Sequence, residues 1–496
     1  MKAGMHPTRR EFIALTTGVA ALGCATGYAH PRPAGEASAA TVSGVSGREQ
    51  TPIATGWDLV PEILARIVPP RFPDRAFDIT SFGARDAHAA DATGAIRHAI
   101  AACAAAGGGR VVVPPGRFLT GPIHLASHVN LHLEEGATLA FVQDPKAYLP
   151  LVLTRFEGME LWNYSPLIYA LDATNIAVTG KGTLDGQADV DHWWPWKGAW
   201  KDVPARPGQP TQIPARLRLA EMVEAAVPVS DRVFGEGAYL RSSFIQPYRC
   251  ANVLIEDVTI INSPMWEIHP VLCRNVTVRG VTVRTHGPNN DGCNPESSTD
   301  VLIERCTFDT GDDCIALKSG RNAEGRRLNR PVENVVIRDC AMRDGHGGVV
   351  VGSEASGGAR NIFAERCRMD SPQLDRALRF KTNSVRGGTI EHVYMRDVTV
   401  GQVAEAVVTA DFFYEEGDAG RFPPTLRDVE LRNVTSRKSR YGLLLRGYAH
   451  SPIRDVRVID CDFAGVAEGD RIEGVRDLAF VNTRVNGVLR NERITQ

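Results

Sequence analysis

Three aspartates lie close together in the sequence, in glycine-containing segments typical of turns. Asp291 ends Gly-Pro-Asn-Asn-Asp (287–291), and Asp312 and Asp313 lie in Thr-Gly-Asp-Asp-Cys (310–314). Cleavage of a glycosidic bond needs a carboxylic acid that protonates the leaving oxygen and a carboxylate that activates water. Because clustered carboxylates cannot all ionise cheaply, the pKa of one rises and that group becomes the acid. The spacing predicts an acid/base site if the fold brings these segments together.

A repeated pattern predicts the fold that positions these aspartates. Each copy starts with a polar residue and alternates apolar and polar residues, with a polar pair before a second alternating run. Copies begin at Asn252, Asn275, Asp300, Asn334, Asn361, His392, Asp428, Asp455 and Asp477, and a weaker one begins at Asn175. Alternation predicts strands, and a period of about 22 to 36 residues is typical of a solenoid. We predict an all-β domain over residues 56–496, a single right-handed parallel β-helix whose coils start near residue 75.

Two segments depart from the repeat. Residues 91–105 predict an amphipathic helix with its N-cap at Asp91, which would cover the open end of the solenoid. Residues 186–237 form an insertion with a helical stretch around 217–225 and four tryptophans, namely Trp193, Trp194, Trp196 and Trp200. Aromatic rings stack on sugars, but the simpler interpretation is that these rings pack the insertion onto the β-helix.

Four cysteines occupy the same place in different copies of the repeat, where valine stands in other copies. They are Cys306, Cys340, Cys367 and Cys461. This pattern predicts an inward-facing column of small apolar side chains. A disulfide framework is the alternative in an oxidising compartment. Paired Cys-x-x-Cys spacing is absent, and we expect neither a metal nor a cofactor.

The N-terminus has the pattern of an export signal. Thr-Arg-Arg-Glu-Phe-Ile (8–13) is a twin-arginine motif, and the apolar stretch after it is too short for a membrane span of ~20 residues. We expect a signal peptide at residues 1–29, a disordered linker at 30–55, and a folded protein that is periplasmic or secreted. Lipid attachment at Cys24 is the weaker alternative. The net charge of -2 gives no global basic field for nucleic acid or a membrane surface.

Further charged residues fall at related positions of the repeat. Asp312 lies 12 residues after Asp300, and His346 lies 12 residues after Asn334. Because stacked coils are ~4.8 Å apart, the aspartates and His346 are expected on neighbouring coils of one face. In Arg-Phe-Lys (379–381), alternation directs both cations to that face and the phenylalanine to the core. Each motif taken alone has an ordinary explanation: the Asp-Asp forms a turn, the His is structural, and the Arg-x-Lys is a solvated strand face. Their occurrence in order, at the spacing of the coils, favours a site for a negatively charged sugar.

At this point the sequence resembles glycoside hydrolase family 28, the polygalacturonases, in four ordered motifs. The family's Asn-Thr-Asp, Gly-Asp-Asp, Gly-His-Gly and Arg-Ile-Lys correspond to Asn289-Asn290-Asp291, Gly311-Asp312-Asp313, Gly345-His346-Gly347 and Arg379-Phe380-Lys381. Two middle residues differ, Asn290 and Phe380, and neither position carries charge. The resemblance extends from about residue 74 to near the C-terminus.

The resemblance implies hydrolysis of α-1,4-galacturonosyl bonds with inversion, without a cofactor. Asp312 would be the general acid, and Asp291 and Asp313 would hold and deprotonate the water. His346 would belong to the network that keeps the acid protonated. Inversion needs room for the water, so the carboxyl of Asp312 is expected roughly 6.5–9.5 Å from the base.

The resemblance also implies an acidic substrate. Arg379 and Lys381 would bind the galacturonate carboxylate, and Asn289 is a further candidate for substrate binding. Residues 287–297 and 318–321 look like the exo-acting bacterial and plant-type branch, and the insertion would close one end of the cleft.

Several alternatives stay open at this stage. Rhamnogalacturonan or xylogalacturonan hydrolysis keeps both the fold and the chemistry. A pectate lyase of the same fold would abstract a proton with Arg or Lys and use calcium. A non-enzymatic glycan-binding β-helix has no use for the acidic cluster. The sequence does not fix endo or exo action or the oligomeric state.

Overall fold

The computed structural model describes residues 56–201 and 203–495. The predicted signal peptide and linker, residues 1–29 and 30–55, lie outside the described residues. The described residues belong to one compact unit. Within the part of the chain that the structure describes, no helix has the length and apolar character needed to cross a membrane.

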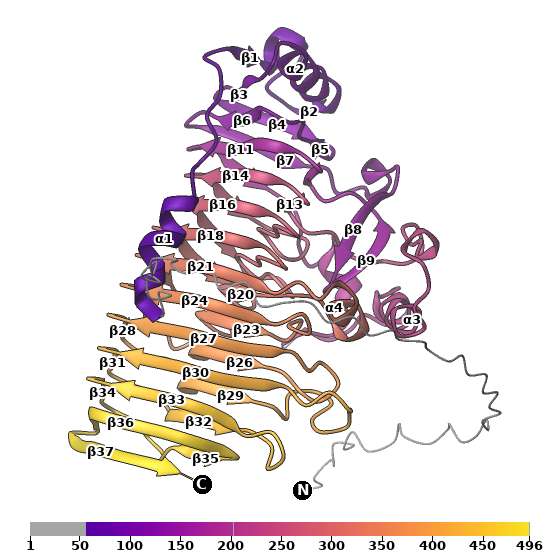
Figure 1. Cartoon of the computed structure of the whole chain (residues 1–496). Coiled ribbons are helices and arrows are strands. Elements are labelled where there is room, and N and C mark those ends of the chain that lie inside the picture. The colour runs from indigo at the N-terminus through magenta and orange to yellow at the C-terminus, as the bar shows by residue number, and fades with distance from the viewer. Residues whose placement is uncertain (1–55, 202, 496) are drawn as a thin grey trace, which may run out of the picture. The chain divides into compact units, whose positions relative to one another are not determined.

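The described residues form the predicted right-handed parallel β-helix, whose coils build three parallel ladders, mostly with one strand each and in two coils with an isolated bridge in the third ladder (Figure 1). The first ladder runs through β1 (Ala76–Asp78), β3 (Gly109–Val113), β6 (Val129–Leu133), β11 (Thr174–Gly180), β14 (Ala251–Glu256), β16 (Arg274–Arg279), β18 (Thr299–Glu304), β21 (Val332–Arg338), β24 (Ala359–Glu365), β27 (Thr389–Arg396), β30 (Thr425–Arg432), β33 (Ile453–Ile459) and β36 (Val475–Val485).

Within each coil, the strand of the first ladder is followed along the chain by a strand of the second ladder and then by the third ladder. The second contains β2 (Ala87–Asp91), β4 (Gly116–Thr120), β7 (Ala137–Phe141), β12 (Thr183–Asp185), β15 (Thr259–Ile261), β17 (Thr282–Thr285), β19 (Thr307–Thr310), β22 (Ala341–Met342), β25 (Arg368–Met369), β28 (Thr399–Val400), β31 (Thr435–Ser436) and β34 (Asp462–Phe463). The third contains β5 (Ile123–His124), β10 (Ile168–Leu171), β13 (Ile245–Tyr248), β20 (Ile315–Leu317), β23 (Val349–Gly352), β26 (Arg376–Lys381), β29 (Ala406–Asp411), β32 (Tyr441–Arg446) and β35 (Arg471–Glu473), with isolated bridges joining β13 to β20 through Ile268 and Cys293.

The polar residue that starts each repeat has a physical reason. Asn252 and Asn275 have φ angles of 57° and 56°, and the first residue of every other predicted copy also has a positive φ. Asn and Asp tolerate this left-handed conformation better than other L residues. The side chains also bond from coil to coil: Asn252 donates to Asn175 at 2.8 Å, and Asn275 donates to Asn252 at 2.7 Å.

The core fills the inside of the coils with inward-facing residues of all three ladders. Cys306, Cys340, Cys367 and Cys461 are buried in it, which confirms the predicted inward column. All nine cysteines of the described residues are free thiols, so the disulfide alternative is not seen there.

Both ends of the solenoid are covered. The predicted capping helix is α2 (Thr93–Ala105), whose Ile96, Ala99 and Ile100 enter the core at the N-terminal end. The N-cap is Ala92, which makes no side-chain cap bond, so the predicted N-cap at Asp91 is wrong by one residue. Asp91, the residue before it, accepts a hydrogen bond from the Thr93 backbone N–H at 2.8 Å. At the other end, β37 (Val488–Thr495) pairs antiparallel with β36 and ends the parallel stacking.

Helix α1 (Leu59–Arg66) lies along the outer side of the first ladder, after η1 (Gly56–Asp58) (Figure 1). Its Val60 and Ile63 pack against residues of β18, β21, β24 and β27. The short helices η2 (Ile79–Phe82) and η3 (Pro145–Tyr148) lie in connections of the first coils.

Elements inserted between strands gather on one side of the β-helix (Figure 1). The predicted insertion contains η4 (Trp194–Lys197), α3 (Ile213–Glu224) and η5 (Val229–Asp231). Two elements on the same side were not predicted: the hairpin of β8 (Val152–Phe156) and β9 (Met159–Asn163), and helix α4 (Asn322–Leu328). Trp193 is buried, its ring contacts Trp196 at 4.9 Å between centroids, and Trp194 donates its indole N–H to the Ser263 carbonyl at 2.8 Å. These three rings pack the insertion, as the simpler interpretation predicted.

Candidate active site

The predicted site residues come together in the connections between the second and third ladders and on β26. Asp291 follows β17, Asp312 and Asp313 lie between β19 and β20, and His346 lies between β22 and β23. Since consecutive coils stack in register, connections at the same phase of the repeat become neighbours in space. Asp291, Asp312 and His346 line one pocket of about 440 Å³ with Arg379 and Lys381, within the size range of ligand sites, whereas the buried Asp313 is not part of its lining.

Asp312 and Asp313 lie outside regular strands, so strand alternation does not send them to opposite faces. The Asp312 backbone N–H donates to the Asn290 carbonyl at 3.2 Å, and the Asp313 N–H donates to the Asp312 carboxylate at 3.0 Å. Gly311 permits this turn because a Cβ there would lie 2.3 Å from the Gly287 carbonyl oxygen. The bend at Gly311 therefore lets both aspartates reach the same cluster.

The three carboxylates lie closer together than expected. One oxygen from each of Asp291, Asp312 and Asp313 lies within 4.8 Å of the others. The expected separation of 6.5–9.5 Å is therefore wrong for these nearest oxygens. The reason is that all three groups project from adjacent tight turns. At this spacing Asp291 is not the sole candidate for a base, and Asp313 is a second one.

Exposure separates the three carboxyls. The Asp312 side chain is 18% exposed, whereas those of Asp291 and Asp313 are 3% and 0% exposed. Asp312 is therefore the carboxyl that meets a ligand first.

His346 faces Asp312, with its Nδ1 3.0 Å from the Asp312 Oδ1. Burial acts to raise the pKa of Asp312, but the positive charges of His346, Lys381 and Lys318 outweigh burial and lower it. The Asp312 charge in turn raises the pKa of His346. In the free protein His346 thus favours an ionised Asp312, the opposite of the expected effect.

Asp291 holds the proton of the cluster. Burial and the neighbouring Asp312 charge raise its pKa to about 8, although Lys318 opposes them. The Lys318 ammonium lies 3.5 Å from Asp291 and 3.0 Å from Glu354. Asn294 donates to Asp291 at 3.0 Å. Near neutral pH the pair of Asp291 and Asp312 therefore carries one proton.

This raised pKa predicts how stability depends on pH. The folded-state pKa of Asp291 lies above the value of an unfolded aspartate, so its contribution is complete near pH 4 and is lost as pH rises through about 8. Asp291→Asn does not titrate, so it should exceed wild type in unfolding free energy by a few kcal/mol at pH 8.5 and match it near pH 4. Chemical denaturation at both pH values measures the difference. Asp74→Asn, at a 98% exposed side chain, is the control, and a parallel pH dependence of wild type and Asp291→Asn would contradict the assignment.

A fourth carboxyl lies next to the cluster and was not predicted. Glu267 is fully buried, and neither of its carboxylate oxygens has a hydrogen-bond partner among the described residues. Its backbone N–H donates to the Asp291 carbonyl at 2.9 Å. Burial raises the pKa of Glu267 well above its usual range. Glu267 is thus a neutral acid beside the cluster, at a position that sequence alternation alone does not distinguish.

The two cations of Arg379-Phe380-Lys381 lie on the face that strand alternation predicted. Phe380 is buried in the core, while Arg379 and Lys381 line the pocket. The Lys381 ammonium donates to Asp313 at 2.5 Å, and the Arg379 guanidinium lies 3.6 Å from the other Asp313 oxygen. Burial lowers the pKa of Lys381, but the Asp313 charge outweighs it and raises it. Both cations therefore pair with Asp313 as well as facing the pocket.

Asn289 and Asn290 have different environments. Asn289 lines the pocket with a positive φ of 56°, and its side-chain oxygen accepts from the buried Arg241 at 2.7 Å. Asn290 is fully buried, accepts from the Gly287 N–H at 2.7 Å and donates to two backbone carbonyls. Asn290 therefore shapes the turn that carries Asp291.

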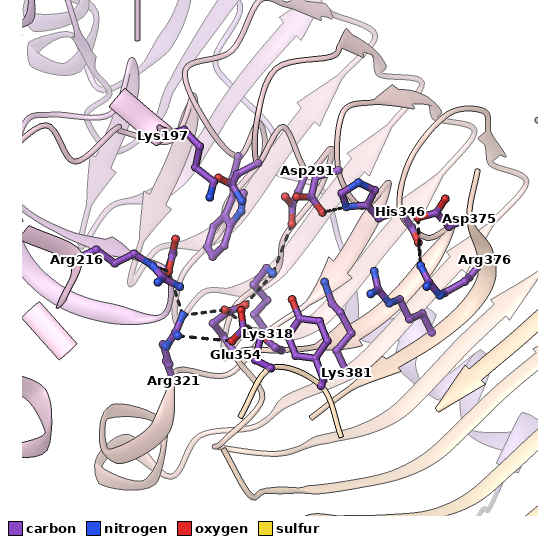
Figure 2. Close-up of a pocket in the computed structure, with 18 residues that line it drawn as sticks. Lys197, Arg216, Asp291, Lys318, Arg321, His346, Glu354, Asp375, Arg376 and Lys381 are labelled. Atoms are coloured by element: carbon purple, nitrogen blue, oxygen red, sulfur yellow. Dashed lines mark hydrogen bonds and ion pairs between the residues drawn. The ribbon is translucent and has the colours of Figure 1, made fainter. Parts of the chain in front are cut away.

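The pocket also has a wall at the predicted insertion, whose lining residues sequence reasoning did not identify (Figure 2). Glu157 comes from the β8–β9 hairpin, Lys197 from η4 and Arg216 from α3. Trp266 and Tyr414 are the aromatic residues of the lining, and the four tryptophans of the insertion do not belong to it. No repeat relates the insertion to the motifs, so only its composition pointed to a role at the cleft.

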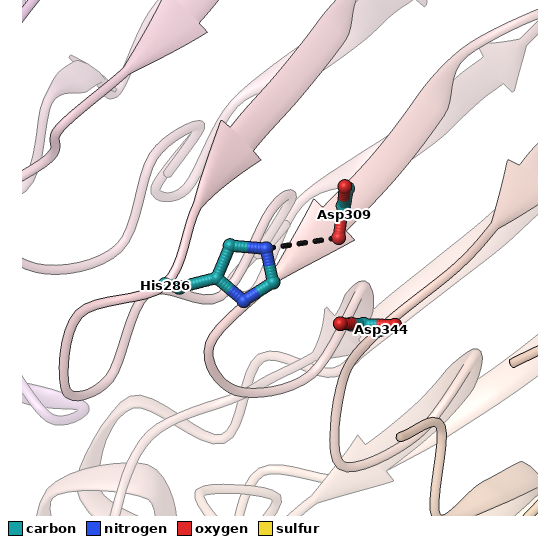
Figure 3. A group of neighbouring side chains, drawn as sticks. All are labelled: His286, Asp309 and Asp344. Atoms are coloured by element: carbon teal, nitrogen blue, oxygen red, sulfur yellow. Dashed lines mark hydrogen bonds and ion pairs between the residues drawn. The ribbon is translucent and has the colours of Figure 1, made fainter. Parts of the chain in front are cut away.

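Two groups among the described residues have ligand-type atoms close enough to hold a metal ion. The first is the aspartate cluster, whose charge is already balanced by Lys318, Lys381 and Arg379. The second is His286, Asp309 and Asp344 (Figure 3). There His286 bonds Asp309 at 2.9 Å, and Asp344 accepts from the Ser371 hydroxyl at 2.6 Å.

A parallel β-helix with a cluster of carboxylates in a cationic cleft defines a carbohydrate-active enzyme, and comparison with known proteins identifies the family. The sequence profile of glycosyl hydrolases family 28 matches residues 238–480. A solved structure, a hyperthermoactive exopolygalacturonase from Thermotoga maritima, is 44% identical with a TM-score of 0.86, covering 89% of this chain and 99% of that one. The chain belongs to glycosyl hydrolases family 28.

Two curated relatives are more distant. A probable polygalacturonase of Vitis vinifera is 28% identical over 71% of this chain and 66% of its own length. An exo-poly-alpha-D-galacturonosidase of Dickeya chrysanthemi is 27% identical over 74% of this chain and 62% of its own length. The chain thus spans less than two thirds of the length of either relative.

Proposed function

We propose that the protein hydrolyses α-1,4-galacturonosyl bonds of polygalacturonate. The observation that carries the proposal is the pocket itself, where seven Lys and Arg side chains surround the aspartate cluster. A polyanionic sugar chain complements such a surface, whereas a neutral glycan offers these cations no opposite charge. Family membership and the relatives' activities on galacturonan support the same substrate.

The roles follow from the exposure of the three carboxyls of the cluster and from the number of protons that they hold. Asp312, the most exposed carboxyl, protonates the leaving oxygen, while Asp291 and Asp313 hold the attacking water. The free protein stores the proton on Asp291, so transfer within the pair makes Asp312 the acid and leaves Asp291 ionised as a base. The number of protons is unchanged. His346 controls this transfer through its bond to Asp312.

Exo action follows from the wall formed by the insertion and the hairpin. Lys197, Arg216 and Glu157 lie beside the cleft at positions that no coil of the β-helix provides. Such a wall limits the sugar chain on that side to a terminal segment. The Thermotoga maritima relative, an exopolygalacturonase, supports this interpretation.

The test is incubation of the purified protein with polygalacturonate. We expect release of short galacturonate products from chain ends while viscosity falls slowly, and inversion at the anomeric carbon by NMR. Absorbance from an unsaturated uronate would instead indicate a lyase. Binding of polygalacturonate without any release of reducing sugar would indicate a glycan-binding β-helix.

We also propose export through the twin-arginine route, on the strength of Arg9 and Arg10 and the apolar stretch after them. Replacing both by Lys should abolish appearance of the protein in the periplasm or medium of a bacterial host. Arg48→Lys, in the predicted linker, is the matched control. Normal export of the Arg9→Lys/Arg10→Lys variant, detected by fractionation and immunoblot, would refute the twin-arginine signal.

A further inference from the structure

One cation of the pocket has no ionic partner among the described residues. No carboxylate of residues 56–201 and 203–495 lies within 4 Å of the Lys197 ammonium, and none of their groups hydrogen-bonds to it. The other Lys and Arg side chains of the pocket are all paired, Arg216 and Arg321 with Glu157, Lys318 with Glu354, Arg376 with Asp375, and Arg379 and Lys381 with Asp313. Lys197 is thus left free to meet a ligand.

The backbone around Lys197 is fixed by packing. Lys197 ends η4, whose Trp196 contacts Trp193 and Tyr239 with ring centroids 4.9 Å and 5.3 Å away. The Gln212 N–H donates to the Trp196 carbonyl at 2.7 Å, which ties η4 to the start of α3. The ammonium is therefore presented to the pocket from a rigid support, which reduces the entropy lost on binding.

Charges of both signs surround the Lys197 ammonium. Burial lowers the pKa of Lys197, and the Arg241 and Arg216 charges lower it further, while Glu157 and Asp312 oppose them. Figure 2 shows Lys197 and Arg216 on one side of Asp291, with His346 and Arg376 on the other. An anionic group placed beside Lys197 would relieve this repulsion and would still lie near Asp312.

We propose that Lys197 binds the carboxylate of the sugar on the insertion side of the scissile bond. The inference rests on the proposed function. It adds that a free carboxylate is bound on each side of the scissile bond, by Lys197 on one side and by Arg379 and Lys381 on the other. An ammonium–carboxylate hydrogen bond is charge-assisted and strong in a partly buried site. A methyl ester on that sugar would leave Lys197 desolvated and unpaired.

The test uses Lys197→Met, Lys197→Arg and the matched control Lys438→Met, whose lysine is exposed and outside the pocket. We expect Lys197→Met to raise KM for trigalacturonate and the inhibition constant of digalacturonate roughly 10- to 100-fold, as for loss of a charge-assisted hydrogen bond. The kcat and its pH profile should change much less. Lys197→Arg should recover most of the affinity, and Lys438→Met should match wild type.

The outcomes separate the two claims. If wild type and Lys438→Met release no sugar from polygalacturonate, the proposed function fails. If both are active and Lys197→Met has the KM and inhibition constant of wild type, the hydrolase stands and the role of Lys197 is refuted. A fall in kcat of Lys197→Met with unchanged KM and a shifted pH profile would also refute it, because Lys197 would then act through Asp312.

Discussion

Replacing Asp312 by Asn is expected to lower kcat on polygalacturonate by about 10²–10⁴-fold, the usual cost of losing a general acid. The amide cannot donate a proton to the leaving oxygen, yet it keeps the size of the carboxyl. It can also still accept the hydrogen bond from the Asp313 backbone N–H, which is 3.0 Å in the wild-type structure. Steady-state hydrolysis of polygalacturonate measures the loss, and near-normal turnover would remove Asp312 from this role.

The same variant has a second readout that a merely damaged fold would not produce. The Asp312 charge is the largest cause that raises the pKa of His346. In Asp312→Asn the His346 pKa should therefore fall, which NMR titration of the imidazole detects. An unchanged thermal midpoint with a lower His346 pKa would show that the site is intact but lacks its acid. An unchanged His346 pKa would contradict the pairing of His346 with Asp312.

The sequence was sufficient to predict the solenoid because its repeat reflects a backbone requirement. The polar residue that opens each copy, such as Asn252, adopts a positive φ, and the alternation that follows fills one core. The motif residues could be placed together for the same reason, since the same phase in successive coils means the same place in space. Arg379, Phe380 and Lys381 follow alternation within a regular strand, β26.

What could not be predicted depends on segments that no repeat relates. Lys197 and Arg216 reach the pocket from η4 and α3, whose placement is set by packing of Trp193 and its neighbours. The carboxylate spacing depends on the turn at Gly311, where close backbone contact leaves no room for a Cβ. The family expectation for inverting enzymes therefore overstated the separation, and the proton was expected on Asp312 although the surrounding charges place it on Asp291.

Replacing Lys381 by Met should lower both stability and activity, because Lys381 holds a buried charge. Its ammonium bonds Asp313 at 2.5 Å, and the Asp313 side chain is 0% exposed. Removing one partner of a buried ion pair typically costs 3–5 kcal/mol, since the other charge stays desolvated. Arg379, 3.6 Å from the second Asp313 oxygen, should reduce this cost to about 2–4 kcal/mol. Activity should fall roughly 10- to 100-fold, as for loss of one charge-assisted hydrogen bond. Denaturant unfolding and kcat/KM on polygalacturonate measure the two effects.

A double variant separates the structural role of Lys381 from its contact with the sugar. Lys381→Met/Asp313→Asn removes both charges, so its unfolding free energy should return towards that of wild type while activity stays low. Arg379→Met is the matched control, because its longer contact with Asp313 predicts a smaller loss of stability. If the double variant is no more stable than Lys381→Met, the buried charge of Asp313 is not what Lys381 compensates. If Lys381→Met retains wild-type stability but loses activity on polygalacturonate, Lys381 acts on the substrate carboxylate alone, and Arg379 is sufficient as the partner of Asp313.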